Sequence, residues 1–94
     1  MTKTRSLLQL VAEADELQAK TRLARAAALT HIREQSPELD AALNDLFADN
    51  DLAQAQWIFR QLFRREERPI DLILTGRTEE VTHIALAIAY GIYL

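Results

Sequence analysis

The chain has 94 residues, of which 49% are hydrophobic and 27% are charged, enough for one folded domain with a modest core. Its net charge of −3 gives no overall attraction to nucleic acid or to an anionic membrane, and the absence of cysteine excludes disulfides and thiolate metal sites. No signal peptide or membrane-spanning run is readable, so we expect a cytoplasmic protein.

Residues 1–36 predict one long helix and a turn, with the helix running from about Thr4 to about Ile32. Its length, about 40 Å, exceeds what a domain of this size needs. Its apolar residues have helical spacing and are Leu7, Leu10, Val11, Ala14, Leu17, Ala24, Ala27 and Ala28. Positions 7, 10, 14, 17, 21, 24 and 28 follow a loose heptad, with Thr21 as its polar member. Two interpretations remain open: a helix that faces the core, and a helix that pairs with a second copy in a homodimer.

A second helix is predicted after Ser36, a suitable N-cap, with Pro37 in the first helical position. The apolar face of this helix is formed by Leu39, Ala42, Leu43 and Leu46, and Phe47 closes it. Residues 49–51, Asp-Asn-Asp, are interpreted as a turn and cap, because the glycine and distant glutamate of a calcium loop are missing. A third helix is predicted from about Leu52 to Phe63.

Two shorter helices complete the prediction of an all-α single domain of about five helices. Pro69 at the start and Gly76 after the end favour a helix over 70–75, although residues 70–74 would also fit a strand. Thr78 is predicted to cap the last helix, which runs to Tyr90. We expect a core centred on Trp57. Its buried residues should include Trp57, Phe59, Leu62, Leu72, Val81 and Ile84.

The last fourteen residues of the sequence carry no charged side chain. One apolar stripe of the last helix consists of Val81, Ile84, Ala85 and Ile88. Other apolar residues lie elsewhere on the same helix, so it has to be covered on more than one side. We predict that the chain's own core covers one side and that a partner covers the other. The candidate partner-binding residues are His83, Leu86, Tyr90, Gly91, Ile92, Tyr93 and Leu94.

No pattern in the sequence is typical of an enzyme: a cysteine nucleophile, a glycine-rich phosphate loop and a G-x-S-x-G elbow are all missing. We therefore expect no catalytic residue, no metal and no cofactor. His83 is interpreted as an ordinary core or interface residue, with metal binding, catalysis and pH switching as alternatives.

Four arginines lie near aromatic residues: Arg60, Arg64, Arg65 and Arg68. They are interpreted as structural ion pairs or a solvated face, because Glu66 and Glu67 lie among them. A contact with a protein partner and binding of nucleic acid are the alternatives.

Three segments occur in the order found in a known family. They are Leu46-Phe-Ala-Asp-Asn-Asp-Leu-Ala-Gln-Ala-Gln-Trp57, Pro69-Ile-Asp-Leu-Ile-Leu-Thr-Gly-Arg-Thr-Glu-Glu-Val81 and Ala89-Tyr-Gly-Ile-Tyr-Leu94. Through them, residues 39–94 resemble the toxin-binding domain of Xre/MbcA/ParS-type antitoxins.

The resemblance implies a bacterial antitoxin, with 37–94 as the toxin-binding region, that neutralises a RES-type toxin, an enzyme that degrades NAD. In this family the C-terminal end of the antitoxin reaches the active-site cleft of the toxin, a role that would fall to residues 90–94. Family members often begin with a helix-turn-helix-like DNA-binding domain. Because residues 1–36 read as one helix instead, nucleic-acid binding is not expected from this chain. The alternative function is a self-associating structural or regulatory module without a toxin.

Overall fold

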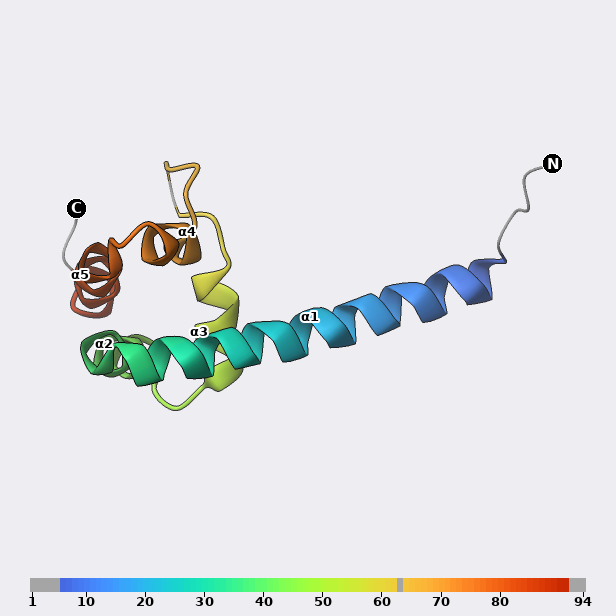
Figure 1. Ribbon diagram of the computed structural model, residues 1–94, viewed down its shortest axis with the longest axis horizontal. Coiled ribbons are helices and arrows are strands. Elements are labelled where there is room, and N and C mark those ends of the chain that lie inside the picture. Colours follow the sequence, from blue (N-terminus) through green and yellow to red (C-terminus); the bar gives the residue numbers. More distant parts are fainter. Residues whose placement is uncertain (1–5, 63, 92–94) are drawn as a thin grey trace.

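The computed structural model describes residues 6–62 and 64–91, and within them the chain forms five helices and no strand. The helices are α1 (Leu7–Gln35), α2 (Pro37–Phe47), α3 (Asp51–Ile58), α4 (Pro69–Leu74) and α5 (Thr78–Ala89) (Figure 1). The all-α prediction is confirmed, and so is the choice of helix over strand for α4. The predicted end of the third helix at Phe63 is wrong, because α3 ends at Ile58 and residues 59–62 are not helical. The predicted start at Thr4 and the tail 92–94 lie outside the described residues. None of these helices has the length and apolar character that crossing a bilayer requires.

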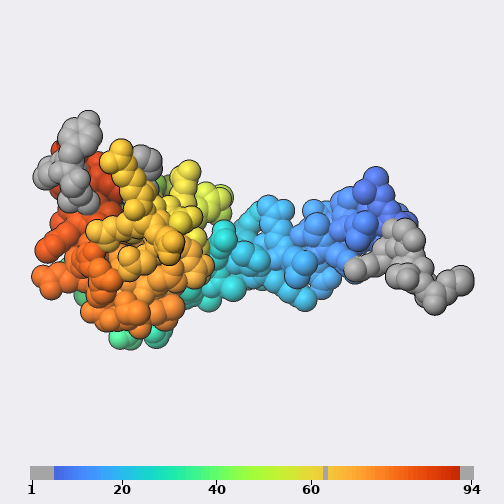
Figure 2. Space-filling view, turned by 90° about the horizontal axis from the view of Figure 1, so that it is seen from above, coloured from blue at the N-terminus to red at the C-terminus, as the bar shows by residue number. Residues whose placement is uncertain are grey.

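The molecule consists of a helical head and a projecting stalk (Figures 1 and 2). We define the stalk as residues 7–24 of α1 and the head as the described residues from 25 onward. The extents are 55 × 26 × 24 Å and the radius of gyration is 16.6 Å, against about 12 Å for a compact domain of this length. Every residue of the stalk is exposed, and the buried residues of α1 are Leu29 and Ile32. The core-facing interpretation is therefore wrong for the apolar stripe of the stalk.

Local capping explains where the first helices begin. Ser36 ends α1 and starts α2, because its hydroxyl accepts a hydrogen bond from the Leu39 N–H at 3.3 Å and Pro37 follows in the first turn. Asn50 caps α3 by accepting from the Ala53 N–H at 3.1 Å. The predicted cap at Ser36 and the capping role of residues 49–51 are confirmed.

Gly76 ends α4 in the left-handed conformation that the sequence predicted, with φ of 79°. The Gly76 N–H donates to the Ile73 carbonyl at 3.1 Å and the Arg77 N–H to the Leu72 carbonyl at 2.8 Å, which is a Schellman motif. Since Arg77 also occupies the N-cap position of α5, Thr78 is already helical. The predicted side-chain cap by Thr78 is wrong.

The core lies where α5 packs on α2, with the end of α1, α3 and α4 around them. Its buried residues are Leu29, Ile32, Leu39, Leu43, Ala55, Ile58, Ile70, Leu72, Val81 and Ile84. Leu29 and Ile32 belong to this core, so the segment before Ser36 is part of the same packing unit as residues 37–91.

The predicted centre of the core is shifted by one residue. Ile58 is fully buried, whereas Trp57, Phe59 and Leu62 are half-buried and pack against the core from outside. The cause is that α3 ends at Ile58, so Phe59 and Leu62 leave the helix instead of extending its buried face. The Trp57 ring contacts Phe47, with ring centroids 6.2 Å apart.

Candidate protein-binding surface

Helix α5 is covered by its own chain over most of its circumference. Its buried residues are Val81, Thr82, Ile84, Ala85 and Ala87. The uncovered side carries His83, Leu86 and Tyr90, whose spacing of three and four residues places them on one helix face. His83 and Tyr90 are exposed and Leu86 is half-buried. A core position for His83 is therefore wrong, because its side chain faces solvent; a role in an interface stays a prediction.

The C-terminal end of α5 presents apolar and aromatic side chains to solvent. Ile88 is 49% exposed and Tyr90 66% exposed, and both precede Gly91, which has φ of 69° and ends the helix. We call Leu86, Ile88, Tyr90 and Gly91 the α5 tip. Ile92, Tyr93 and Leu94, the other predicted partner-binding residues, lie outside the described residues.

Tyr90 is held in place by the neighbouring helix. Its hydroxyl donates a hydrogen bond to Asp45 Oδ2 of α2 at 3.2 Å. This hydrogen bond, with the negative charge of Asp45 and partial desolvation, raises the pKa of Tyr90 above its usual value. The hydroxyl therefore stays protonated at neutral pH, and the hydrogen bond fixes the ring against the packed α2–α5 pair.

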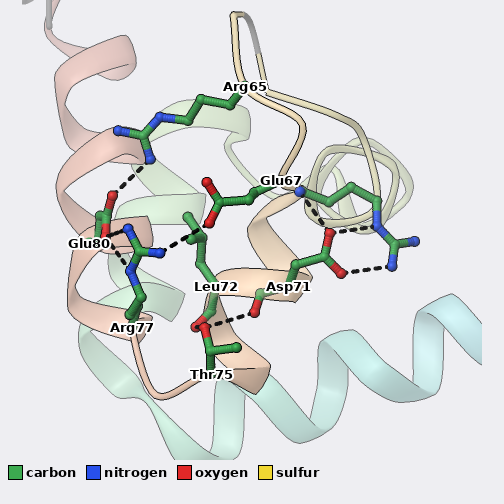
Figure 3. A network of polar contacts seen from close by, with 8 residues as sticks. Arg65, Glu67, Asp71, Leu72, Thr75, Arg77 and Glu80 are labelled. Carbon is green, nitrogen blue, oxygen red and sulfur yellow. Dashed lines mark hydrogen bonds and ion pairs between the residues drawn. The ribbon is translucent and has the colours of Figure 1, made fainter.

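The predicted arginine cluster forms ion pairs that tie the segment before α4 to α4 and α5 (Figure 3). Arg65 Nη1 lies 2.7 Å from Glu80 Oε1, and Arg68 donates two hydrogen bonds to the Asp71 carboxylate at 2.9 and 3.1 Å. Arg77 joins the same network through Glu67, at 3.0 Å, and through Glu80. The ion-pair interpretation is confirmed for Arg65 and Arg68.

The network lowers the pKa of Asp71 and of Glu80 because the arginines stabilise the charged forms of these two acids. Hydrogen bonds from the Arg68 side chain and backbone lower the pKa of Asp71 to about 2. Hydrogen bonds from Arg65 and then Arg77 lower the pKa of Glu80. The guanidinium groups of Arg65, Arg68 and Arg77 are therefore already paired with carboxylates of the same chain.

A buried polar cluster at the junction of α1, α2 and α3 was not predicted. Gln54 is fully buried; its side-chain amide donates to Asn44 Oδ1 at 3.1 Å and to the Ala48 carbonyl at 2.8 Å, and its carbonyl oxygen accepts from Arg33. Arg33 also lies 2.8 Å from Asp51 Oδ1. The available signal was that Gln54 stands one helical turn before Ile58, on the buried side of α3. The cluster fixes the end of α1 to the α2–α3 turn, which is a structural role.

An apolar groove of about 520 Å³ lies between the end of α1, α4 and the start of α5. Its lining includes Ala28, Ile32, Ile70, Ile73 and Leu74, and Leu74 is 75% exposed. The groove could not be predicted from the sequence, since three separate helices form it. Thr78, the first residue of α5, also lines the groove. The groove and the α5 tip therefore lie at opposite ends of α5.

Comparison with known proteins finds no matching family model, no matching curated protein and no matching solved structure. The resemblance of residues 39–94 to Xre/MbcA/ParS-type antitoxins therefore stays a prediction. Within the part of the chain that the structure describes, no group of three or more His, Cys, Asp or Glu side chains is arranged to hold a metal ion.

Proposed function

We propose that this protein is a non-enzymatic, antitoxin-like binding protein that neutralises a RES-type toxin, with the α5 tip directed toward the toxin's active-site cleft. The observation that carries the proposal is the exposure of Ile88 and Tyr90 at the end of α5, next to a tail of apolar and aromatic residues. Side chains of this kind dominate the binding energy of protein interfaces when a partner buries them.

The arrangement of the tip favours insertion into a cleft. The hydrogen bond from Tyr90 to Asp45 restricts the ring before binding, so less conformational entropy is lost when a partner covers it. Gly91 adopts a left-handed conformation that a side chain would disfavour, so the helical conformation does not continue through it. The family resemblance adds that the three matching segments include this end of the chain.

The direct test is whether a neighbouring reading frame encodes a RES-type enzyme. The full chain should co-purify with that enzyme and inhibit its degradation of NAD. We expect Tyr90→Ala to weaken the inhibition at least about tenfold, the effect of losing one aromatic anchor. Leu74→Ala removes a comparably exposed apolar side chain from the end of α4, far from the α5 tip, and is the matched control.

Removal of residues 92–94 should abolish inhibition and leave the helix content and melting temperature nearly unchanged. If the chain inhibits no such enzyme, or if Tyr90→Ala and Leu74→Ala inhibit equally well, the proposed role of the tip is wrong. A truncated chain that unfolds would instead assign these residues to the core.

Self-association is the second candidate function, and the exposed apolar stripe of the stalk favours it. The stalk and the α5 tip lie at opposite ends of the molecule (Figure 1). One chain could therefore bind a toxin and a second copy of itself at the same time.

A further inference from the structure

The stalk carries an apolar stripe that nothing in the described chain covers. Leu7, Leu10 and Leu17 are 77%, 46% and 64% exposed, and Figure 2 shows this part of α1 clear of the head. The stripe follows alternating spacings of three and four residues, through positions 7, 10, 14, 17, 21 and 24. That spacing is typical of a helix whose partner is another helix. The other side of the stalk also has leucines, but Asp15 interrupts it.

We propose that this stripe binds a second copy of the chain, with the two α1 helices antiparallel and Leu7 of each against Ala24 of the other. Pairing of the two stalks does not depend on toxin binding. Two independent features of the stalk select a second copy as the partner and select this register.

The first feature is the order of large and small residues along the stripe. Leucines occupy the outer positions 7 and 10, and Thr21 and Ala24 occupy the positions nearest the head. The antiparallel register therefore pairs a large residue with a small one in every layer. The layers are Leu7 with Ala24, Leu10 with Thr21, and Ala14 with Leu17, each formed twice. A parallel pair in register would place leucine against leucine at one end and alanine against alanine at the other, which packs unevenly.

The second feature is charge. In an antiparallel pair the side chains that flank the stripe at Glu13 and Lys20 face each other across the interface, giving two pairs of opposite charge. In a parallel pair Lys20 would face Arg25 of the second copy, which is a repulsive contact. Within one chain Lys20 contacts Glu16 at 3.1 Å, a highly exposed surface pair that leaves the ammonium group accessible to a second carboxylate.

The head also accommodates the antiparallel arrangement. The head begins at Arg25, which packs over the Phe59 ring with its guanidinium carbon 5.4 Å from the ring centroid. The partner's Leu7 would then lie beside Ala24, just before the head. The two heads would lie at opposite ends of the paired stalks, where they cannot collide.

The oligomeric state of the full chain tests the occupant. By sedimentation velocity, we expect the wild type to dimerise at micromolar concentration. Leu10→Asp and Leu17→Asp should each raise the dissociation constant at least a hundredfold. Leu8→Asp and Leu23→Asp introduce the same change at exposed leucines off the stripe and should leave the dimer intact. Circular dichroism and melting of the head check that all four variants fold.

A cross-linking experiment tests the orientation, and the natural chain has no cysteine to interfere. Leu7→Cys and Ala24→Cys chains, when mixed under oxidising conditions, should form the mixed disulfide, and neither should cross-link efficiently with itself. Self-cross-linking of Leu7→Cys would show a parallel pair. The two positions are about 25 Å apart along the helix, so the two outcomes are distinct.

Charge reversal gives a rescue test. Glu13→Lys should raise the dissociation constant about tenfold or more, and Glu13→Lys combined with Lys20→Glu should restore it. A wild type that stays monomeric at hundreds of micromolar would overturn the proposal and leave the stripe to a different protein. Equal effects of stripe and off-stripe variants would overturn it as well. A toxin-binding failure with an intact dimer would reject only the proposed function.

Discussion

Ala48 lies in a backbone conformation that glycine adopts more readily. Its φ of 53° and ψ of −138° place it at the first central position of a turn closed by the Asn50 N–H and the Phe47 carbonyl at 3.2 Å. We predict that Ala48→Gly stabilises the protein by about 1 kcal/mol. Glycine relieves backbone strain of about 1–3 kcal/mol in the folded state. Its greater freedom in the unfolded chain offsets about 0.4–1 kcal/mol of that gain. Urea denaturation measures the difference.

Ala41→Gly is the matched control for this prediction. Ala41 is exposed in the interior of α2, where the same chemical change should destabilise the protein by about 1 kcal/mol. The two variants should therefore shift the urea midpoint in opposite directions. A loss of stability in Ala48→Gly would show that Ala48 carries no strain.

Single buried residues were harder to predict than exposed ones. The apolar spacing of the third helix placed the core near Trp57 correctly, but the fully buried residue is Ile58. The hydrogen-bond partners of the buried Gln54 could not be predicted, because Asn44 and Arg33 come from two other helices. Tyr90 is exposed as the uncharged run predicted, but Ile88, which belongs to the stripe with Val81 and Ile84, is 49% exposed rather than buried. The role of the α5 tip in binding stays a prediction.

At the scale of whole helices, local signals predicted the caps of α2 and α3 and the end of α4, but they failed for the cap of α5 and for the end of α3. Ser36, Asn50 and Gly76 act within three or four residues of themselves, so the sequence shows their effect directly. Helix α3 ends at Ile58 without a glycine or proline stop signal, and no residue between Ile58 and Pro69 marked that end. The ion pairs between the segment before α4 and α5 could not be predicted from local signals either, because residues such as Arg65 and Glu80 are far apart along the chain.

The contact between Arg68 and Asp71 at the start of α4 should make the protein sensitive to strong acid. The pKa of Asp71 is about 2 in the folded chain and about 3.9 in an unfolded chain. The unfolded state therefore binds a proton first as the pH falls. The stabilisation is complete above about pH 4 and is lost as the pH drops toward 2.

Urea midpoints at pH 5, 4, 3 and 2 measure this contribution. We expect Asp71→Asn to lower the midpoint at pH 5, and we expect the difference from the wild type to shrink between pH 4 and pH 2. The difference should be small, because the pair is solvent-accessible. A constant difference over the whole pH range would show that the charge of Asp71 contributes nothing.

At the scale of the molecule, the head and stalk differ in what holds them folded. The head has its own core, whereas the stalk depends on local interactions such as the Ser6–Gln9 capping box and the Glu16–Lys20 pair. Most of the stability of a protein helix comes from packing of its apolar face, which the stalk lacks within its own chain. If the second copy supplies that packing, the order of the stalk has to depend on protein concentration.

Hydrogen exchange at two concentrations tests this dependence. Amides of residues 10–20 should be protected above the dissociation constant of the dimer and should exchange rapidly well below it. Amides of the buried α2 segment Leu39–Leu43 should exchange slowly at both concentrations. Leu17→Asp should make the stalk exchange rapidly at every concentration, because it prevents pairing without touching the head. Protection of the stalk that is independent of both concentration and Leu17→Asp would mean that α1 is stable alone, and the antiparallel pair would then not be what keeps it helical.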